Sequence, residues 1–136
     1  MQTLKIACLG LMVFMLNTGC SSKSVNGNVN NSEKNTEKVS VYYFHFNVRC
    51  VACRAVEAQT QADVKELFGN KVSFHAYNLD EDQGIAMGKK LGVYGQMLLI
   101  VKGDKKINLT NEGFMYAKVN PAKFKKILNN NIKPLL

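Results

Sequence analysis

The sequence has no tryptophan, no internal repeat and no apolar run long enough to span a membrane as a mature helix. The absence of a repeat excludes solenoid and propeller architectures. The two histidines and four cysteines match no standard zinc-binding spacing. With 46% hydrophobic residues, seven Phe and five Tyr, the 136-residue chain has an ordinary globular composition, and its length suits one domain with additional segments.

Acidic residues are also scarce, because ten Asp and Glu stand against eighteen Lys and Arg, which gives a formal net charge of +8. The lysines are scattered, with only short pairs such as Lys89-Lys90 and Lys125-Lys126, and no nucleic-acid-binding motif accompanies them. We therefore expect no nucleic-acid binding. The sequence instead predicts a solvated basic surface, which can attract anionic lipid or acidic partners.

Residues 1–19 have the pattern of a signal peptide, with an apolar stretch from Ile6 to Leu16. The small residues directly before Cys20 resemble a bacterial lipobox, which implies that Cys20 is acylated and begins the mature protein. The resemblance predicts a lipid-anchored protein of the cell envelope that faces the periplasm. Ser21 resembles an outer-membrane sorting signal, although the choice between outer and inner membrane stays open. The alternative is a plain signal peptide with an incidental cysteine.

Residues 20–38 are rich in Ser, Asn, Lys and Glu, with two isolated valines and no hydrophobic periodicity. This segment cannot bury enough apolar surface to fold, so we predict a lipid-anchored, disordered tether. Its role would be reach, because it separates the following domain from the membrane. We place the folded domain at residues 39–136.

The folded domain is predicted to alternate strands and helices in the order β-α-β-α-β-β-α. The expected strands are Val39–Phe46, Val72–Asn78, Met97–Val101 and Lys106–Leu109, and the expected helices are Cys53–Phe68, Gln83–Leu91 and a last one from Pro121. Asp80 and Gln83 have the spacing of a capping box, and Asn120 is a suitable cap for the last helix. This order predicts an α/β fold with a central four-stranded mixed sheet flanked by three helices.

Cys50-Val51-Ala52-Cys53 lies between the first expected strand and the first expected helix. The thiolate is the nucleophile in dithiol chemistry, and a helix N-terminus lowers the pKa of a thiol. Arg49 and Arg54 flank the pair and should stabilise a thiolate further. These residues predict thiol–disulfide exchange.

Three other interpretations of the cysteine pair remain open. A purely structural disulfide is disfavoured, because so small a loop gains little from chain entropy. A metal site is chemically feasible, since thiolates bind zinc or copper(I). Further ligands for it would come from His45, His75 or Met97. The third is an inert interaction domain, in which Asn111–Asn120 forms a contact loop with two aromatic residues, Phe114 and Tyr116.

Residues Val39–Leu136 resemble the thioredoxin-like superfamily, and in particular small bacterial thioredoxin-like lipoproteins. The stretches that carry the resemblance are Tyr42–His45 followed by Arg49-Cys50, Asn78-Leu79-Asp80, Leu91–Gly95 and the dithiol itself. The resemblance implies that Cys50 attacks as a thiolate and that Cys53 resolves the mixed disulfide. It implies a redox-active disulfide with no other cofactor, a monomer, and partners that carry protein thiols or disulfides, with a membrane thiol–electron transporter as one candidate.

The chain departs from the thioredoxin pattern at several positions. Arg49 replaces the Trp before the first cysteine, and Val51-Ala52 replaces Gly-Pro. The buried acid that thioredoxins carry six residues before the first cysteine corresponds by spacing to Phe44, and His45 is a candidate substitute. The cis-proline that faces the dithiol is replaced by Gln96-Met97, where we expect a trans peptide bond and a substrate groove.

Overall fold

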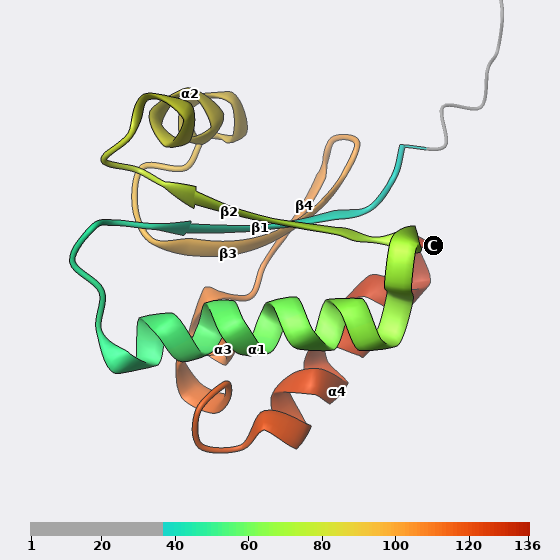
Figure 1. The fold of residues 1–136 in the computed structure, drawn as a ribbon. Coiled ribbons are helices and arrows are strands. Elements are labelled where there is room, and N and C mark those ends of the chain that lie inside the picture. Colours follow the sequence, from blue (N-terminus) through green and yellow to red (C-terminus); the bar gives the residue numbers. More distant parts are fainter. Residues whose placement is uncertain (1–36) are drawn as a thin grey trace, which may run out of the picture. The chain divides into compact units, whose positions relative to one another are not determined.

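The computed structural model describes residues 37–136, so residues 1–19, Cys20 and nearly all of the 20–38 segment lie outside the described part. One sheet with strand order β2-β1-β3-β4 forms the centre of this part (Figure 1). The strands are β1 (Ser40–His45), β2 (Ser73–Asn78), β3 (Met97–Lys102) and β4 (Lys105–Asn108). β1 pairs in parallel with β2 and antiparallel with β3, and β3 pairs antiparallel with β4, so the predicted mixed sheet is confirmed.

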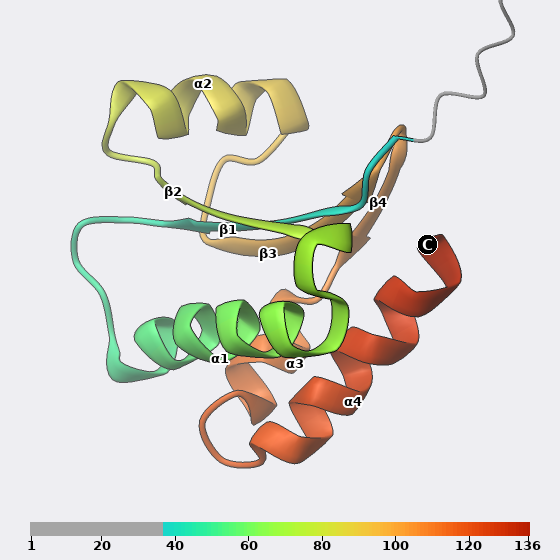
Figure 2. The same ribbon diagram turned by 45° about the vertical axis from the view of Figure 1, so that its right-hand side comes forward.

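Helices cover both faces of this sheet. They are α1 (Val51–Phe68), α2 (Asp82–Leu91), α3 (Thr110–Tyr116) and α4 (Pro121–Ile132), with short 3-10 turns at Gly69–Lys71 and Lys133–Leu135. α1, α3 and α4 lie on one face and α2 alone lies on the other (Figure 2). None of the helices in residues 37–136 is long and apolar enough to cross a bilayer.

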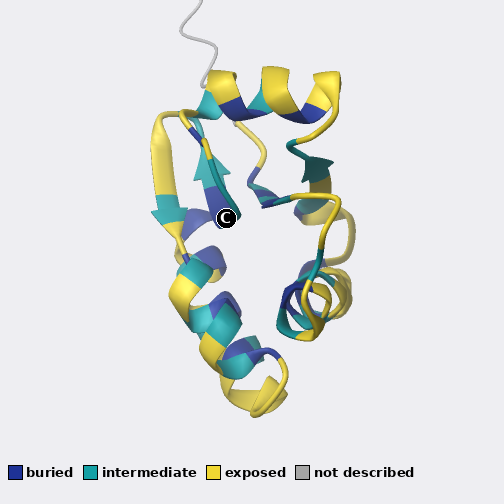
Figure 3. Ribbon diagram, turned by 90° about the vertical axis from the view of Figure 1, so that its left-hand side faces the viewer, coloured by how far each residue is buried: buried dark blue, intermediate teal, exposed yellow. Residues whose placement is uncertain are grey.

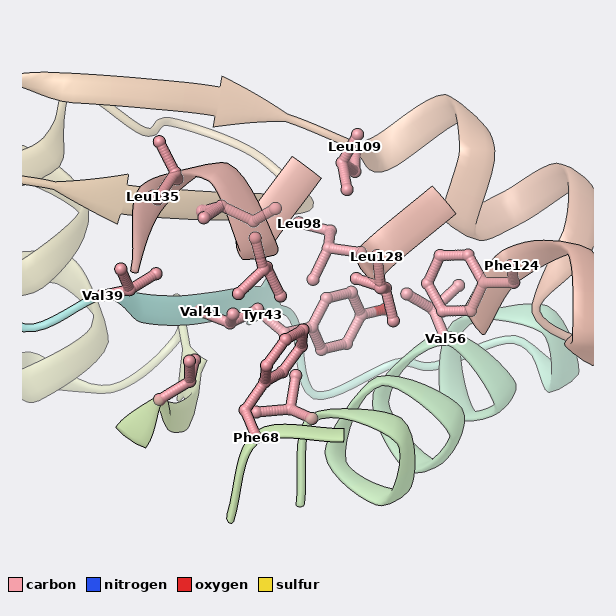
Figure 4. Close-up of a cluster of buried hydrophobic side chains, with 14 of the residues drawn as sticks. Val39, Val41, Tyr43, Val56, Phe68, Leu98, Leu109, Phe124, Leu128 and Leu135 are labelled. Atoms are coloured by element: carbon pink, nitrogen blue, oxygen red, sulfur yellow. The ribbon is translucent and has the colours of Figure 1, made fainter. Parts of the chain in front are cut away.

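β1 is the central strand because its side chains are apolar on both faces. Val41 and Tyr43 point toward α1 and are fully buried there with Leu98, Phe124 and other side chains (Figure 4). Phe44 points to the opposite face, where a smaller cluster lies under α2. The near-continuous apolar run of β1 therefore divides, by strand alternation, between two separate cores.

α2 packs closely on the end of β2 because two of its residues are glycines. A Cβ atom on Gly84 would lie 1.8 Å from the backbone oxygen of Asn78, so no other residue fits without a shift of the backbone. The predicted capping box between Asp80 and Gln83 is wrong. The N-cap of α2 is Glu81, which makes no side-chain capping bond, and the Asp80 carboxylate instead accepts a hydrogen bond from Asn47 N at 2.6 Å.

The structure adds α3, a short helix in the segment that was expected to be a loop. Gly113, inside this helix, lets α3 approach α1 closely, since a Cβ atom there would lie 3.1 Å from a methyl group of Val56. Phe114 and Tyr116 are partly buried against the larger core cluster. These aromatic residues therefore pack on the core. At the start of α4, the predicted Asn120 cap is confirmed, because its Oδ1 accepts from Lys123 N at 3.1 Å.

Candidate active site

Cys50 and Cys53 form a disulfide at the N-terminus of α1, with Cα atoms 5.0 Å apart. Cys50 is the N-cap residue and is exposed to solvent. Cys53 lies in the first turn and is only 6% exposed. One sulfur is therefore open to a partner, and the other lies behind it against the sheet.

Backbone N–H groups at this helix end point to both sulfur atoms. Cys50 Sγ accepts from Cys53 N at 3.0 Å, and Cys53 Sγ accepts from Cys50 N at 3.2 Å, in the arrangement of a capping box. The helix dipole places partial positive charge at the same point. A negative charge that develops on Cys50 is stabilised by both effects.

A chain of hydrogen bonds, buried at Tyr43 and half-buried at Gln96, connects the sheet to Cys53. Tyr43 Oη donates to the backbone oxygen of Cys53 at 2.9 Å, and Gln96 Nε2 donates to Tyr43 Oη at 2.6 Å. The other amide atom, Gln96 Oε1, lies 3.8 Å from Cys53 Sγ. Burial raises the pKa of Tyr43 above its ordinary value, although Gln96 and Arg49 act in the opposite direction, so Tyr43 keeps its proton and acts as a donor.

Arg49 is held by two neighbours on the side of the disulfide. Its guanidinium forms an ion pair with Glu57 on α1, and its Cζ lies 5.9 Å from the ring centroid of Tyr43. Its Nε is buried without a hydrogen-bond partner among residues 37–136. Arg54, by contrast, is exposed on the first turns of α1. Much of the positive charge of Arg49 is therefore compensated by Glu57.

The loop that leads from β1 to Cys50 is fixed by polar contacts with the end of β2. Asn78 Nδ2 donates to Asn47 Oδ1 at 2.7 Å, and Asn47 N donates to the Asp80 carboxylate at 2.6 Å. Asp80 N in turn donates to Asn78 Oδ1 at 3.1 Å. These bonds connect the first and second strand–helix turns, and they limit how far the loop before Cys50 can move.

No protein-family model matches this chain, and neither does any curated protein. Thioredoxin O2 from Arabidopsis thaliana, in its oxidised state, is similar in structure, with a TM-score of 0.50 and 20% identity over 69% of this chain and 75% of that one. Thioredoxin f2 from Chlamydomonas reinhardtii has a TM-score of 0.47 and 16% identity over 70% and 80% of the two chains. The fold is that of thioredoxin.

Phe44, six residues before Cys50, is matched by spacing alone to the buried acid of the thioredoxin pattern. Phe44 lies on the α2 face of the sheet, away from the disulfide. Tyr43, seven residues before Cys50, points to the disulfide face and reaches the backbone of Cys53. The sequence contained a signal for this residue, because Tyr43 shares the alternation of Val39 and Val41, whose side chains enter the larger core.

Gln96 and Met97, which replace the cis-proline of the thioredoxin pattern, have different surroundings. Gln96 faces Cys53, whereas Met97 pairs with Phe44 and packs in the core cluster under α2. No cis peptide bond occurs in residues 37–136, so the bond between them is trans, as expected. Of the two, Gln96 is therefore the residue that lies at the disulfide.

The histidines are not in contact with the disulfide. Nδ1 of His45 is hydrogen-bonded to the Phe46 carbonyl at 3.1 Å, and His75 stacks on Tyr42 on the far face of the sheet. Within residues 37–136, no three His, Cys, Asp or Glu side chains come together in a group that could hold a metal ion. His45 thus makes no bond to Cys53, and Tyr43 and Gln96 are the residues that do.

Proposed function

We propose that this protein is a membrane-tethered thiol–disulfide oxidoreductase, or electron carrier, that exchanges its dithiol and disulfide with a protein partner. The observation that carries the proposal is the unequal placement of the two sulfur atoms. Cys50 is exposed at the N-cap of α1, where a thiolate is stabilised, and Cys53 is buried within bonding distance of it. The thioredoxin fold supports the same interpretation, because it provides this strand–helix geometry.

The exchange can be written with Cys50 as the nucleophile. In the reduced protein, the Cys50 thiolate attacks a partner disulfide R–S–S–R′, which forms Cys50–S–S–R and releases R′–S⁻. The Cys53 thiol then loses its proton, which R′–S⁻ takes up, and its sulfur attacks Cys50 Sγ and releases R–S⁻. Two electrons pass to the partner, and the Cys50–Cys53 bond forms. The reverse sequence accepts two electrons from a partner dithiol.

The surroundings of Cys50 suit a protein partner. Exposed apolar side chains lie near it in sequence on the loop and on the first turn of α1, including Val48, 94% exposed, and Val51, 59% exposed. We propose that Arg49 and Arg54 favour the thiolate of Cys50, and that Gln96 lines the groove where the partner chain lies. Met97, the other residue expected there, packs under α2 on the opposite face of the sheet and is not part of this groove. A protein acting in this way needs no cofactor besides its own disulfide.

We also propose that Cys20 is lipidated and that the protein acts in the bacterial cell envelope, anchored to a membrane on its periplasmic side. The support for this part is the lipobox-like sequence before Cys20 and the polar segment after it. Acyl chains on Cys20 give stable anchoring, since several chains bind a bilayer far more strongly than one. In this arrangement, a membrane thiol–electron transporter is a suitable partner, and the domain acts as a monomer.

The experiment that tests the exchange chemistry is a redox titration. A chain with Cys8→Ser and Cys20→Ser, in which Cys50 and Cys53 are the remaining cysteines, is equilibrated in glutathione buffers, and its free thiols are alkylated and counted by mass spectrometry. We expect a single two-electron transition with a midpoint between about −300 and −100 mV. Cys53→Ser should then trap mixed disulfides, and Cys50→Ser should trap none. A disulfide that never equilibrates with glutathione would contradict the proposal.

A further inference from the structure

The side-chain amide of Gln96 has one orientation that satisfies its neighbours. The hydroxyl of Tyr43 donates its only proton to the backbone oxygen of Cys53, so toward Gln96 this hydroxyl can only accept. Nε2 of Gln96 supplies that donor at 2.6 Å. The carbonyl atom Oε1 is consequently turned to the other side, where it faces Cys53 Sγ at 3.8 Å.

The two sulfur atoms therefore have different partners. Cys50 Sγ faces the backbone N–H of Cys53, which is a donor and favours a negative sulfur. Cys53 Sγ faces an oxygen that has no proton to give, in a position where the residue is 6% exposed. A thiol at Cys53 can donate S–H to Oε1 while its sulfur still accepts the Cys50 N–H at 3.2 Å. A thiolate there has no proton to donate, and its negative charge would face the negative end of the amide dipole.

We propose that Gln96 is a positioning residue for the resolving step: oriented by Tyr43, it holds Cys53 as a protonated thiol in the reduced protein and leaves the negative charge to Cys50. This inference rests on the proposed exchange function and deepens it. In the exchange, Cys53 keeps its proton until the mixed disulfide has formed on Cys50. The proton then leaves for the departing partner thiolate, and the Cys53 sulfur displaces the partner from Cys50 with its electron pair. Gln96 itself gains and loses no proton.

The test compares Gln96→Met with the wild-type sequence in the chain with serine at positions 8 and 20. Methionine keeps the length of the side chain and removes Oε1 and Nε2. A hydrogen bond to the reduced form is lost, so the equilibrium with glutathione at pH 6 should move toward the disulfide by about two- to tenfold. In a pH series of alkylation, Cys53 should become reactive at lower pH than in the wild type. The difference between the two proteins should decrease at high pH, where Cys53 is deprotonated in both.

Gln96→Glu provides an independent test with the opposite sign. A carboxylate beside Cys53 opposes a second negative charge, so the alkylation of Cys53 should begin at higher pH than in the wild type. Gln83→Met is the matched control, because Gln83 is exposed on α2, on the other face of the sheet, and should behave as wild type. A Tyr43→Phe chain, which loses the group that orients the amide, should change in the same direction as Gln96→Met and by a smaller factor.

The outcomes separate the inference from the function on which it depends. Opposite shifts for Gln96→Met and Gln96→Glu, with Gln83→Met unchanged, would support the positioning role. If the wild type exchanges with glutathione and both Gln96 variants follow its pH profile, the inference is wrong and the exchange function stands. If the wild type does not exchange, the proposed function itself fails.

Discussion

Asp63 gives a prediction about pH and stability that follows from its surroundings. This carboxylate lies on α1, is 2% exposed and faces α4. Its Oδ1 accepts from Gln59 Nε2 at 3.0 Å and lies 4.0 Å from Lys125 Nζ, while Oδ2 is buried without a hydrogen-bond partner in the described part of the chain. Lys125 is shared, because its Nζ is 2.5 Å from Glu66. In Figure 3, buried residues (dark blue) lie on the inner side of the helices, and exposed residues (yellow) lie on the outer side.

The pKa of Asp63 is raised above its ordinary value, mainly by burial; the Gln59 bond and Lys125 act in the opposite direction, and the charge of Glu66 raises it further. The folded state therefore binds a proton at a pH where the unfolded chain has already lost it. The contribution of Asp63 to the free energy of unfolding rises as the pH falls through the raised pKa of the folded state. It stops rising once the pH is below the pKa that Asp63 has in the unfolded chain. At neutral pH, burial of the charged carboxylate costs about 1 kcal/mol, because the Gln59 bond and Lys125 offset most of the penalty for removing it from water.

Asp63→Asn mimics the protonated carboxyl group at nearly constant shape. We expect this variant to be more stable than the wild type by about 1 kcal/mol at pH 7.5, and the difference to shrink toward zero as the pH is lowered. Urea unfolding at a series of pH values measures it. Asp104→Asn is the control, since Asp104 is exposed in the turn between β3 and β4 and forms no ion pair within residues 37–136, and its effect should stay small throughout. A difference between Asp63→Asn and the wild type that is constant or grows on acidification would refute this reasoning.

Two other substitutions test the packing and the electrostatics near the site. Gly84→Ala should lower the free energy of unfolding, measured in urea, by about 3 kcal/mol or more, because the added Cβ has no room beside the end of β2. Gly95→Ala is the control: a Cβ there has no atom within 4 Å, so the free energy of unfolding should change by less than about 0.5 kcal/mol. Equal stability of the two variants would contradict this packing. Glu57→Gln should speed the alkylation of reduced Cys50 about two- to fivefold at neutral pH, because the positive charge of Arg49 is then no longer compensated. An unchanged or slower rate would show that Arg49 does not act on Cys50.

The sequence predicted those parts of the fold that depend on strong, local patterns. All four strands lie within one residue of their predicted ends, and the first helix, predicted to begin at Cys53, begins at Val51. The near-continuous apolar character of β1 predicted a strand buried on both faces, and both faces are covered. The pairing of Cys50 and Cys53 follows from the same local geometry, because three residues on a first helical turn bring the two sulfurs together.

What the sequence did not predict depends on contacts between distant segments. α3 has seven residues, too few for a periodic pattern, and it is defined by its packing on α1 and β3. The burial of the Asp63 carboxylate is invisible in an amphipathic pattern, since Asp63 could equally face solvent. The sequence predicts that the Asp80 carboxylate caps a helix. It instead accepts a hydrogen bond from the N–H of Asn47, which is 33 positions away in sequence but close in space. Local motifs for capping compete with such long-range donors, and the sequence does not show which one wins.

Tyr43 shows that a residue on β1 cannot be assigned to the disulfide site by counting positions back from Cys50. A strand alternates its side chains between two faces, so a shift of one residue moves a position to the opposite core. In this chain Tyr43 points to the disulfide face, and Phe44 is directed to α2. The side chains bonded to Cys53 are a neutral hydroxyl, at its backbone oxygen, and a neutral amide, at its sulfur. Because neither group titrates near neutral pH, the proposed exchange must pass the Cys53 proton to the partner or the solvent, and we expect the two thiols to dominate its pH dependence.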